Sequence, residues 1–451
     1  MFDLLIKDTM IVGSDDVFKG SIAVKDGKIA EILPAETSEN AQTIIDGSGK
    51  YLFPGVIDVH VHLNEPGFTW REDFAHGTQA AAVGGVTTVV DMPLQNEPAL
   101  TNCKIFSDKY QAVKSRAFID YAFWGGLTNY NLPDIQGLND SGAAAFKCFL
   151  SPVSSDYTSL DLGKVRKALS IIKNFDGVAG FHCEDYSIIS YEQEQAIESG
   201  KVSRSDFLNS RPLVAELIAV KNIIELSREM GTRVHICHVS HPEVAEEIKI
   251  AKAQGVRITA ETCPHYLIFN EEDFVERGML LKCAPPLRSA EDSERLWQYI
   301  YDGTLDMIVS DHSPCAEYEK SEAEGAFKAW GGISGLQSGL QIMFDQTVVK
   351  RGLHCSLIAR AMSKNAAEVF GMAGKKGELK QGYDADMVLL DPTIKWEITA
   401  DNLKYLNKIS AFIGTKGRGL PVCTILRGEI IASEGQITGK QGYGKLIKRI
   451  E

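Results

Sequence analysis

The sequence predicts an α/β protein: a parallel (β/α)₈ barrel, or TIM barrel, with a small β-sandwich domain built from both ends of the chain. Two observations predict this fold. From Pro54 onward, apolar strand-like runs alternate with helical patterns eight times, whereas both ends of the 451-residue chain contain only short strands and turns. Doubly wound sheets share the alternation, but eight successive units favour a closed barrel. No glycine-rich dinucleotide or phosphate-binding motif follows any of the runs.

The first 53 residues read as short strands broken by turns. Leu4–Ile6 and Met10–Val12 are apolar, and Ser21–Val24 leads through Asp26-Gly27 into Lys28–Leu33. An Asp-Gly pair between two such runs is typical of a β-hairpin. This module is too thin to be stable alone, so we expect it to pack on another part of the chain.

Eight parallel strands are expected in the barrel. The candidates are Val56–His62, Thr87–Met92, Tyr121–Gly125, Ala144–Leu150, Val178–Glu184, Val234–Val239, Arg257–Thr262 and Asp306–Ser310. Helical patterns lie between them, for example at Asp73–Val83, Leu162–Lys173, Ala215–Met230, Pro242–Ala253 and Ala290–Tyr301. A loop at Cys315–Gly332 and two further helical patterns, Gly335–Lys350 and Leu357–Phe370, follow the eighth strand.

The tail returns to a β pattern at Ala385–Leu390 and Cys423–Ile431. Two β fragments that flank a barrel can complete one another as a single sandwich. We therefore expect residues 1–53 and 376–451 to form the sandwich and residues 54–375 to form the barrel.

Composition restricts the partners and the compartment. A formal net charge of −13 argues against nucleic-acid and anionic-membrane binding, since both need basic surfaces. Nine cysteines, an odd number without regular spacing, do not resemble a disulfide framework and indicate a reducing compartment. The N-terminus lacks the layout of a signal peptide, and no apolar run is long enough to span a bilayer. We expect a cytoplasmic protein.

Polar residues at the ends of the apolar strands are the candidates for chemistry, because a (β/α)₈ barrel carries its site at the C-terminal ends of its strands. His60 and His62 close the first strand and share a face, since side chains alternate along a strand. The remaining candidates are Lys147 inside the wholly apolar fourth strand and the residues that close strands five, six and eight, which are His182, His238 and Asp311.

Each candidate also has an ordinary explanation. His182 or His238 alone could be a hydrogen-bonded core histidine, and Asp311 could cap the next helix. Lys147 could pair with a carboxylate or form a Schiff base. All of these explanations would have to hold together at one face of the barrel, so we favour a functional site. His235 has the opposite strand parity to His238, and we expect it to face the helices.

The four histidines suit a divalent metal ion, most simply zinc or a neighbour such as manganese or cobalt. An ammonium group has no lone pair to donate, and two dications would repel it. If the Lys147 amine instead reacts with carbon dioxide, the resulting carbamate is an anion whose two oxygens can bridge two metal ions. Such a centre lowers the pKa of bound water to about 7 and polarises a substrate carbonyl.

The chain resembles the amidohydrolase superfamily. The resemblance rests on Pro54-Gly55-Val56-Ile57-Asp58-Val59-His60-Val61-His62, on the lysine-bearing strand and on the later histidines and aspartate. Within the superfamily, the chain is similar to the cyclic-amide hydrolases: dihydroorotases, hydantoinases (dihydropyrimidinases) and allantoinases. The resemblance covers essentially the whole chain, including Lys380–Asp386 near its end. It implies two metal ions bridged by a hydroxide and by carboxylated Lys147 (N6-carboxylysine). The metal ligands that it implies are His60, His62, Lys147, His182, His238 and Asp311, with Asp311 also the general base and acid.

Residues after the metal-binding motifs bear on the substrate. Dihydroorotases typically have an arginine where this chain has Asn64, and an amide cannot supply the bidentate clamp of a guanidinium. Hydantoinases typically have a tyrosine five residues after the lysine, where this chain has Pro152. The run Ser310-Asp311-His312-Ser313-Pro314-Cys315 and Trp330-Gly331-Gly332-Ile333 resemble allantoinases, whereas Phe68–Glu72 and Gln95–Glu97 depart from their usual pattern.

The resemblance therefore implies hydrolysis of the hydantoin ring of allantoin to allantoate, a step of purine (ureide) breakdown. The bridging hydroxide would attack the ring amide, and Asp311 would pass its proton to the departing nitrogen. Asn64 and Ser313 are candidate substrate contacts, each with loop hydrogen bonding as the alternative. Hydantoinase, dihydroorotase and a non-enzymatic hydantoinase-like scaffold are the alternative functions, and relatives suggest a homotetramer.

Overall fold

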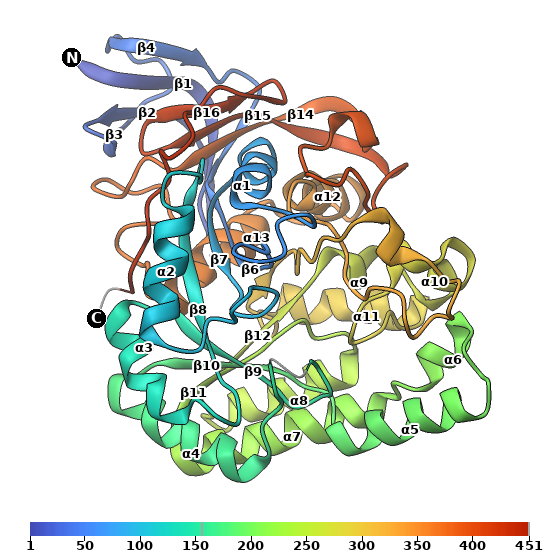
Figure 1. The fold of residues 1–451 in the computed structure, drawn as a ribbon. Coiled ribbons are helices and arrows are strands. Elements are labelled where there is room, and N and C mark those ends of the chain that lie inside the picture. Colours follow the sequence, from blue (N-terminus) through green and yellow to red (C-terminus); the bar gives the residue numbers. More distant parts are fainter. Residues whose placement is uncertain (155–156, 450–451) are drawn as a thin grey trace.

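In the computed structural model, which describes residues 1–154 and 157–449, eight parallel strands form the centre of the molecule (Figure 1). In sheet order and chain order they are β6 (Val56–Val61), β7 (Val86–Asp91), β8 (Asp120–Gly126), β9 (Ala145–Phe149), β10 (Val178–His182), β11 (Arg233–Ile236), β12 (Ile258–Thr262) and β13 (Met307–Ile308). Their order confirms the predicted barrel.

The barrel closes between its first and last strands. A parallel bridge joins Val61 to His312, and the His62 N–H donates to the His312 carbonyl over 2.8 Å. The closing contact therefore lies next to His62 and Asp311. Every residue of β6, β7 and β8 is buried, which explains why these strands read as continuous apolar runs rather than as alternating ones.

Helices cover the outside of the barrel. Those that follow the first seven barrel strands are α1 (Phe74–Val83), α2 (Cys103–Val113), α3 (Ile135–Ser141), α4 (Leu162–Ile172), α5 (Tyr186–Glu198), α6 (Arg204–Asn209), α7 (Leu213–Met230), α8 (Pro242–Ala253), α9 (Pro264–Ile268), α10 (Glu271–Arg277) and α11 (Ala290–Tyr301). Side chains fix several of their starts, as where Asp73 accepts the His76 N–H at the start of α1. The two helical patterns predicted after strand eight are broken by wide π-helical turns into α12 (Gly339–Phe344), α13 (Ser356–Ala359) and α14 (Asn365–Val369).

Strands from both ends of the chain join in one separate nine-stranded sheet. They are β1 (Phe2–Val12), β2 (Val17–Lys25), β3 (Lys28–Leu33), β4 (Ala41–Asp46), β5 (Tyr51–Pro54), β14 (Met387–Glu397), β15 (Lys416–Leu426), β16 (Glu429–Ser433) and β17 (Gln436–Ile437). The two ends meet where β5 pairs with β14, and both contribute to a small apolar cluster that includes Leu4, Ile22, Met387 and Ile425. Asp26 and Gly27 both have positive φ in the predicted hairpin turn between β2 and β3.

After this sheet, the chain returns to the barrel. Leu446 forms a parallel bridge with Tyr121 of β8, so the end of the described chain runs along the outside of that strand. Among the described residues, we find no helix with the length and apolar character that crossing a membrane requires.

Candidate metal centre

The predicted polar residues converge at the C-terminal ends of the barrel strands. A cavity of about 200 Å³ opens there, lined among others by His60, His62, His182, His238 and Asp311. His182 is the last residue of β10, and the other four lie at or just beyond the ends of β6, β11 and β13. All four histidines are at most 5% exposed, so the ring nitrogens are largely shielded from water.

One group of donor atoms is formed by the first and last strands. Asp311 Oδ1 lies 3.1 Å from His60 Nε2 and 3.5 Å from His62 Nε2. Two imidazole nitrogens and a carboxylate oxygen at these separations can share one cation. The second nitrogen of His62, Nδ1, is buried, and no described residue forms a hydrogen bond with it.

A second group lies on the neighbouring strands. His182 Nδ1 and His238 Nε2 are 3.1 Å apart, and the ring centre of His238 is 5.3 Å from that of His60. The two groups are therefore adjacent. The other ring nitrogen of His238, Nδ1, is buried and has no hydrogen-bond partner among the described residues.

Lys147 is fully buried, and its Nζ has no hydrogen-bond partner within residues 1–154 and 157–449. Its neighbours in register are Gly126 on β8 and Gly180 on β10, so neither adjacent strand places a side chain beside it. A Cβ at Gly180 would lie 2.6 Å from the Trp124 ring, which already fills this part of the interior. A buried ammonium without a counter-ion is costly, whereas a carbamate at this position would carry a negative charge towards the histidines.

Two carboxylates that the sequence analysis did not identify hold the histidine rings. Glu261 Oε1 accepts a hydrogen bond from His60 Nδ1, and Glu184 Oε2 lies 2.7 Å from His182 Nε2. An imidazole that donates through one nitrogen presents the lone pair of the other, here His60 Nε2 and His182 Nδ1. Those are the nitrogens that face Asp311 and His238.

The prediction that His235 faces the helices is wrong. Its ring is fully buried inside the barrel, and Nε2 lies 2.9 Å from Oε2 of Glu261. The parity argument fails because His238 has φ of +39°, a left-handed conformation that breaks the alternation after β11. Asp311 (φ +45°) and Gln95 (φ +58°) share this uncommon conformation, which often accompanies a functional site.

The electrostatics suit a cation. Burial lowers the pKa of His60 and His182, and lowers that of His238 well below the ordinary value, so these rings are neutral and carry free lone pairs. Burial alone would raise the pKa of Asp311, but His60 and His62 hold it below its ordinary range. Asp311 is therefore an anion close to these neutral rings.

The wall of the cavity beyond the histidines includes Leu94, Phe149, Pro152, Val153, Cys283 and Ser313. The Gln95 amide donates to Ser313 Oγ over 3.4 Å, and its carbonyl oxygen is buried without a partner. Asn64 is also buried, but its amide donates to the His62 carbonyl over 3.1 Å, and it is not among the residues that line the cavity. Ser313 thus faces the space where a substrate would bind, and a direct contact from Asn64 stays a prediction.

Two further residues at this face were missed. Arg211 lines the cavity and donates to Glu184, so it holds the carboxylate that orients His182. His265, on α9, is buried close to Asp311 with both ring nitrogens unpartnered, and burial lowers its pKa to about 4. The sequence signal for His265 was its position three residues after β12, beyond the strand end itself.

His312, next to Asp311, lies between Gly335 and Glu72. Its Nδ1 accepts the Gly335 N–H over 3.2 Å, and its Nε2 lies 3.8 Å from Glu72 Oε2. Glu72 is fully buried, and burial raises its pKa to about 8, while burial lowers the pKa of His312 to about 3. The pair is therefore neutral at pH 7.

An ion pair joins the loops that follow the first and last strands. Arg71 Nε donates to Glu319 Oε1 over 2.8 Å, and the guanidinium lies 3.9 Å from the ring centre of Trp330. The Trp330 ring N–H in turn donates to the Ser313 carbonyl over 3.3 Å. These contacts connect the loop after β6 with the loop after β13 and with Ser313, which lines the cavity.

Comparison with known proteins agrees with this architecture. The model of the "Amidohydrolase family" matches residues 51–431. An allantoinase of Escherichia coli (strain K12 / DH10B) is 37% identical over 435 residues, which cover 95% of each chain, and one of Salmonella choleraesuis is 36% identical over the same share. Among solved structures, L-hydantoinase (dihydropyrimidinase) from Arthrobacter aurescens superposes with a TM-score of 0.97 and 33% identity over 100% of both chains. Dihydropyrimidinase from Brevibacillus agri superposes with a TM-score of 0.93 and 26% identity, covering 100% of this chain and 99% of the other.

Proposed function

The chain belongs to the amidohydrolase family, and we propose that it opens the hydantoin ring of allantoin by hydrolysis to give allantoate. One observation carries the proposal: four buried histidines, an ionised aspartate and a buried lysine without a partner among the described residues surround the end of one barrel. The substrate assignment rests in addition on the curated relatives, which are allantoinases.

The residues present fit a pair of divalent cations. His60, His62 and Asp311 would hold one ion, and His182 and His238 the other, with the carbamate of Lys147 shared between them. Among the described residues, the buried Nζ of Lys147 has no hydrogen-bond partner, which supports this set because buried polar atoms without partners are rare. Nitrogen-rich ligation suits zinc, and manganese or cobalt would also fit.

Two such cations, when bound, would polarise the scissile carbonyl and lower the pKa of water to about 7. The remaining steps fall to the chain's own residues. The Asp311 carboxylate is ionised and faces the cavity, so it can accept a proton from the attacking water and return it to the departing ring nitrogen. Glu261 and Glu184 keep the lone pairs of His60 and His182 aimed at the site throughout.

The size of the cavity supports a compact ring as substrate. Its volume of about 200 Å³ is small beside the ~300–1,000 Å³ of typical ligand pockets. Gln95 and Ser313 offer an unpartnered carbonyl oxygen and a hydroxyl, which suit the N–H and C=O groups of a ureide. Asn64 and Pro152 stand where relatives that act on dihydroorotate or hydantoin typically have arginine or tyrosine, and neither residue supplies such a group.

The second candidate is a hydantoinase or dihydropyrimidinase activity, favoured by the TM-score of 0.97 to L-hydantoinase from Arthrobacter aurescens. Both candidate activities would use the same metal centre, and they differ only in which cyclic amide fits against the cavity wall beyond the histidines. The shared chemistry is tested first, by reconstituting the protein with zinc, manganese or cobalt and following conversion of allantoin to allantoate. We expect turnover that a chelator abolishes and that Lys147→Ala does not show. A Lys147→Ala protein with full activity and bound metal would contradict the proposed bridging carbamate.

A further inference from the structure

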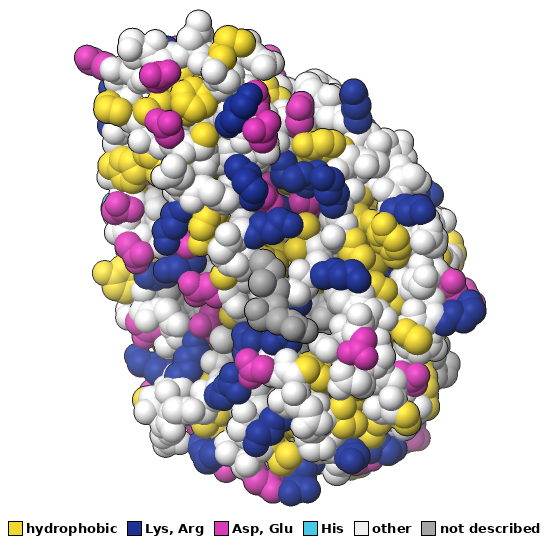
Figure 2. All heavy atoms as spheres, turned by 90° about the vertical axis from the view of Figure 1, so that its left-hand side faces the viewer, with side chains coloured by type: hydrophobic (Ala, Val, Ile, Leu, Met, Phe, Trp, Pro, Cys, Tyr) yellow, Lys and Arg dark blue, Asp and Glu magenta, His cyan; other side chains and the backbone are white. Residues whose placement is uncertain are grey.

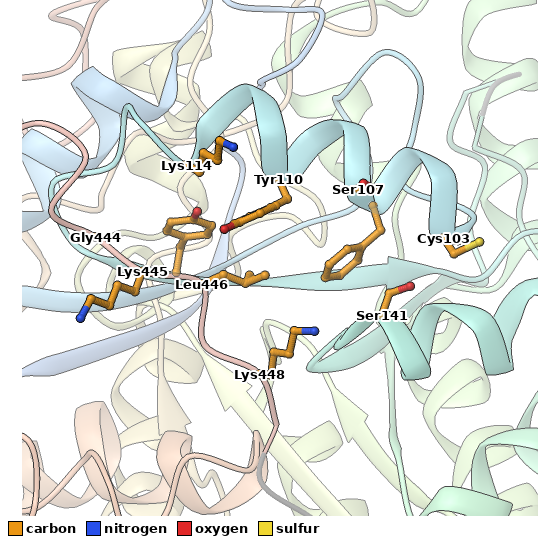
Figure 3. Close-up of a pocket in the computed structure, with 11 residues that line it drawn as sticks. Cys103, Ser107, Tyr110, Lys114, Ser141, Gly444, Lys445, Leu446 and Lys448 are labelled. Carbon is orange, nitrogen blue, oxygen red and sulfur yellow. The ribbon is translucent and has the colours of Figure 1, made fainter.

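A second cavity, of about 600 Å³, lies on the outside of the barrel and shares no lining residue with the cavity at the metal centre. Its walls come from α2, β8, α3 and the segment Gly444–Lys448, which we call the C-terminal tail (Figure 3). In the close-up, α2 runs above the tail, and Tyr110 extends from the helix into the space between them. The volume lies within the ~300–1,000 Å³ that small-molecule sites occupy.

Backbone hydrogen bonds hold the tail in place, so the cavity is formed before any ligand binds. Lys445 N–H donates to Asp120 Oδ1 over 2.9 Å, and its carbonyl accepts the Tyr121 N–H over 3.0 Å. The Ile447 N–H donates back to the Tyr121 carbonyl over 2.7 Å. At Gly444 the backbone comes so close to β8 that a Cβ would lie 1.9 Å from the Ile119 carbonyl oxygen, so only glycine fits there.

The interior of the cavity is aromatic, with one polar atom that lacks a partner. Phe106, Tyr110, Tyr121 and Leu446 line it. Tyr121 is fully buried, and its hydroxyl has no hydrogen-bond partner among the described residues. A hydroxyl left unpaired in an apolar wall costs free energy.

The rim of the cavity is positively charged. Lys114, Lys445 and Lys448 all line it, and within the described residues none of the three forms a salt bridge with a carboxylate. Lys114 donates to the side chain of Gln111 instead. The Lys448 side chain packs against Gly142, where an added Cβ would lie 2.9 Å from Cγ of the lysine.

This local charge opposes that of the whole chain, whose formal net charge is −13. Figure 2 turns this side of the molecule towards the viewer and shows several Lys and Arg side chains close together on it. Unpaired lysines around an apolar cavity attract an anion, and the aromatic walls favour one with a flat body.

We propose that the cavity between α2, β8 and the C-terminal tail binds a small organic anion that carries an unsaturated ring and a carboxylate or phosphate group. The ring packs between Tyr110, Phe106 and Leu446, and the anionic group meets Lys114 and Lys448 at the rim. The site is separate from the metal centre, so binding there does not depend on which cyclic amide the enzyme hydrolyses.

Isothermal titration of the full-length, metal-loaded protein with four probes tests the proposal. Phenyl phosphate and benzoate carry both a ring and a charge, benzyl alcohol has only the ring, and inorganic phosphate only the charge. We expect saturable one-to-one binding of at least one aromatic anion, with the tighter of the two identifying the preferred anionic group. Benzyl alcohol and inorganic phosphate should each bind at least about tenfold more weakly, which corresponds to about 1.4 kcal/mol.

Matched variants locate the binding. Lys114→Gln and Lys448→Gln should each weaken the aromatic anion about three- to fivefold, as expected for exposed charges, and high salt should do the same. Lys440→Gln removes an exposed lysine of the same terminal region that does not line the cavity, and should leave affinity unchanged. All three should keep the catalytic rate of the parent enzyme.

Three results would overturn the proposal. The first is no saturable binding of either aromatic anion at about 5 mM. The second is equal binding of inorganic phosphate or of benzyl alcohol, which would remove the need for the ring or the charge. The third is unchanged affinity in the Lys114→Gln/Lys448→Gln double variant with its fold verified by circular dichroism.

Discussion

Glu261→Gln is the substitution that most sharply tests how the metal centre is held. Glu261 is fully buried and accepts hydrogen bonds from two imidazoles, through Oε1 from His60 and through Oε2 from His235 at 2.9 Å. Burial alone would raise its pKa, but the two histidines hold the pKa of Glu261 below its ordinary range. The wild-type carboxylate is therefore an anion that can accept both N–H groups.

A glutamine in its place can accept only one of them. If its NH₂ faces His60, the ring must accept at Nδ1 and carry its proton on Nε2, which removes the lone pair that faces Asp311. If the NH₂ faces His235, His60 keeps its orientation but loses a buried negative charge beside it. Losses of this kind typically weaken a metal site by about 10–100-fold, or about 1.4–2.8 kcal/mol.

Competition with a chromophoric chelator measures this change in apparent metal affinity. Glu216→Gln is the matched control, because Glu216 is also buried but bonds to Ser240 and Arg288 rather than to a proposed ligand. We expect the control to retain wild-type metal affinity. Wild-type affinity in Glu261→Gln, with the control behaving as expected, would refute the role assigned to this carboxylate.

Three further substitutions give distinct outcomes. Lys147→Ala should lose bound metal by elemental analysis while its far-ultraviolet circular dichroism is unchanged; full metal occupancy would contradict the carbamate. Asp311→Asn should lower kcat by at least about 10²-fold, since the general base is removed, and a kcat within a few-fold of wild type in stopped assays of allantoate would exclude that role. Burial raises the pKa of Glu72 to about 8, so stability from its protonated form is complete below about pH 4.5 and is lost as the pH rises through 8. Denaturant unfolding at pH 6 and pH 8 should therefore show the wild type losing up to about 1.4 kcal/mol per pH unit relative to Glu72→Gln, and parallel profiles would contradict it.

The fold and the polar residues that meet at the strand ends could be predicted from the sequence, because both depend on local patterns. Eight apolar runs can be buried on both faces only in a covered parallel sheet, and the ends of such strands meet at one rim. His60, His62, His182, His238 and Asp311 lie together at that rim in the structure. Their identity as metal ligands is a proposal, supported by this geometry.

Strand parity failed where the backbone leaves the β region. His238 and Asp311 have φ of +39° and +45°, so alternation counted across them assigns side chains to the wrong face. His235 was misplaced for this reason. Glu261 was missed because it lies inside β12 and, unlike Lys147, does not interrupt a wholly apolar run.

Tertiary contacts between distant segments could not be read from one sequence. The Arg71–Glu319 pair joins loops 248 positions apart, and the bridge from Leu446 to Tyr121 needs the chain to return from the terminal sheet to the barrel. The aromatic cavity beneath the C-terminal tail exists only because of that return. The hydrophobic periodicity of these two segments does not predict that they meet.

The most direct test of the proposed function is the initial rate of ring opening on four substrates after metal reconstitution: allantoin, hydantoin, dihydrouracil and dihydroorotate. We predict that allantoin gives the highest kcat/KM and allantoate as product, and that dihydroorotate gives the lowest, since Asn64 cannot clamp a carboxylate. Hydantoin or dihydrouracil turned over much faster than allantoin would contradict the assignment and favour a hydantoinase.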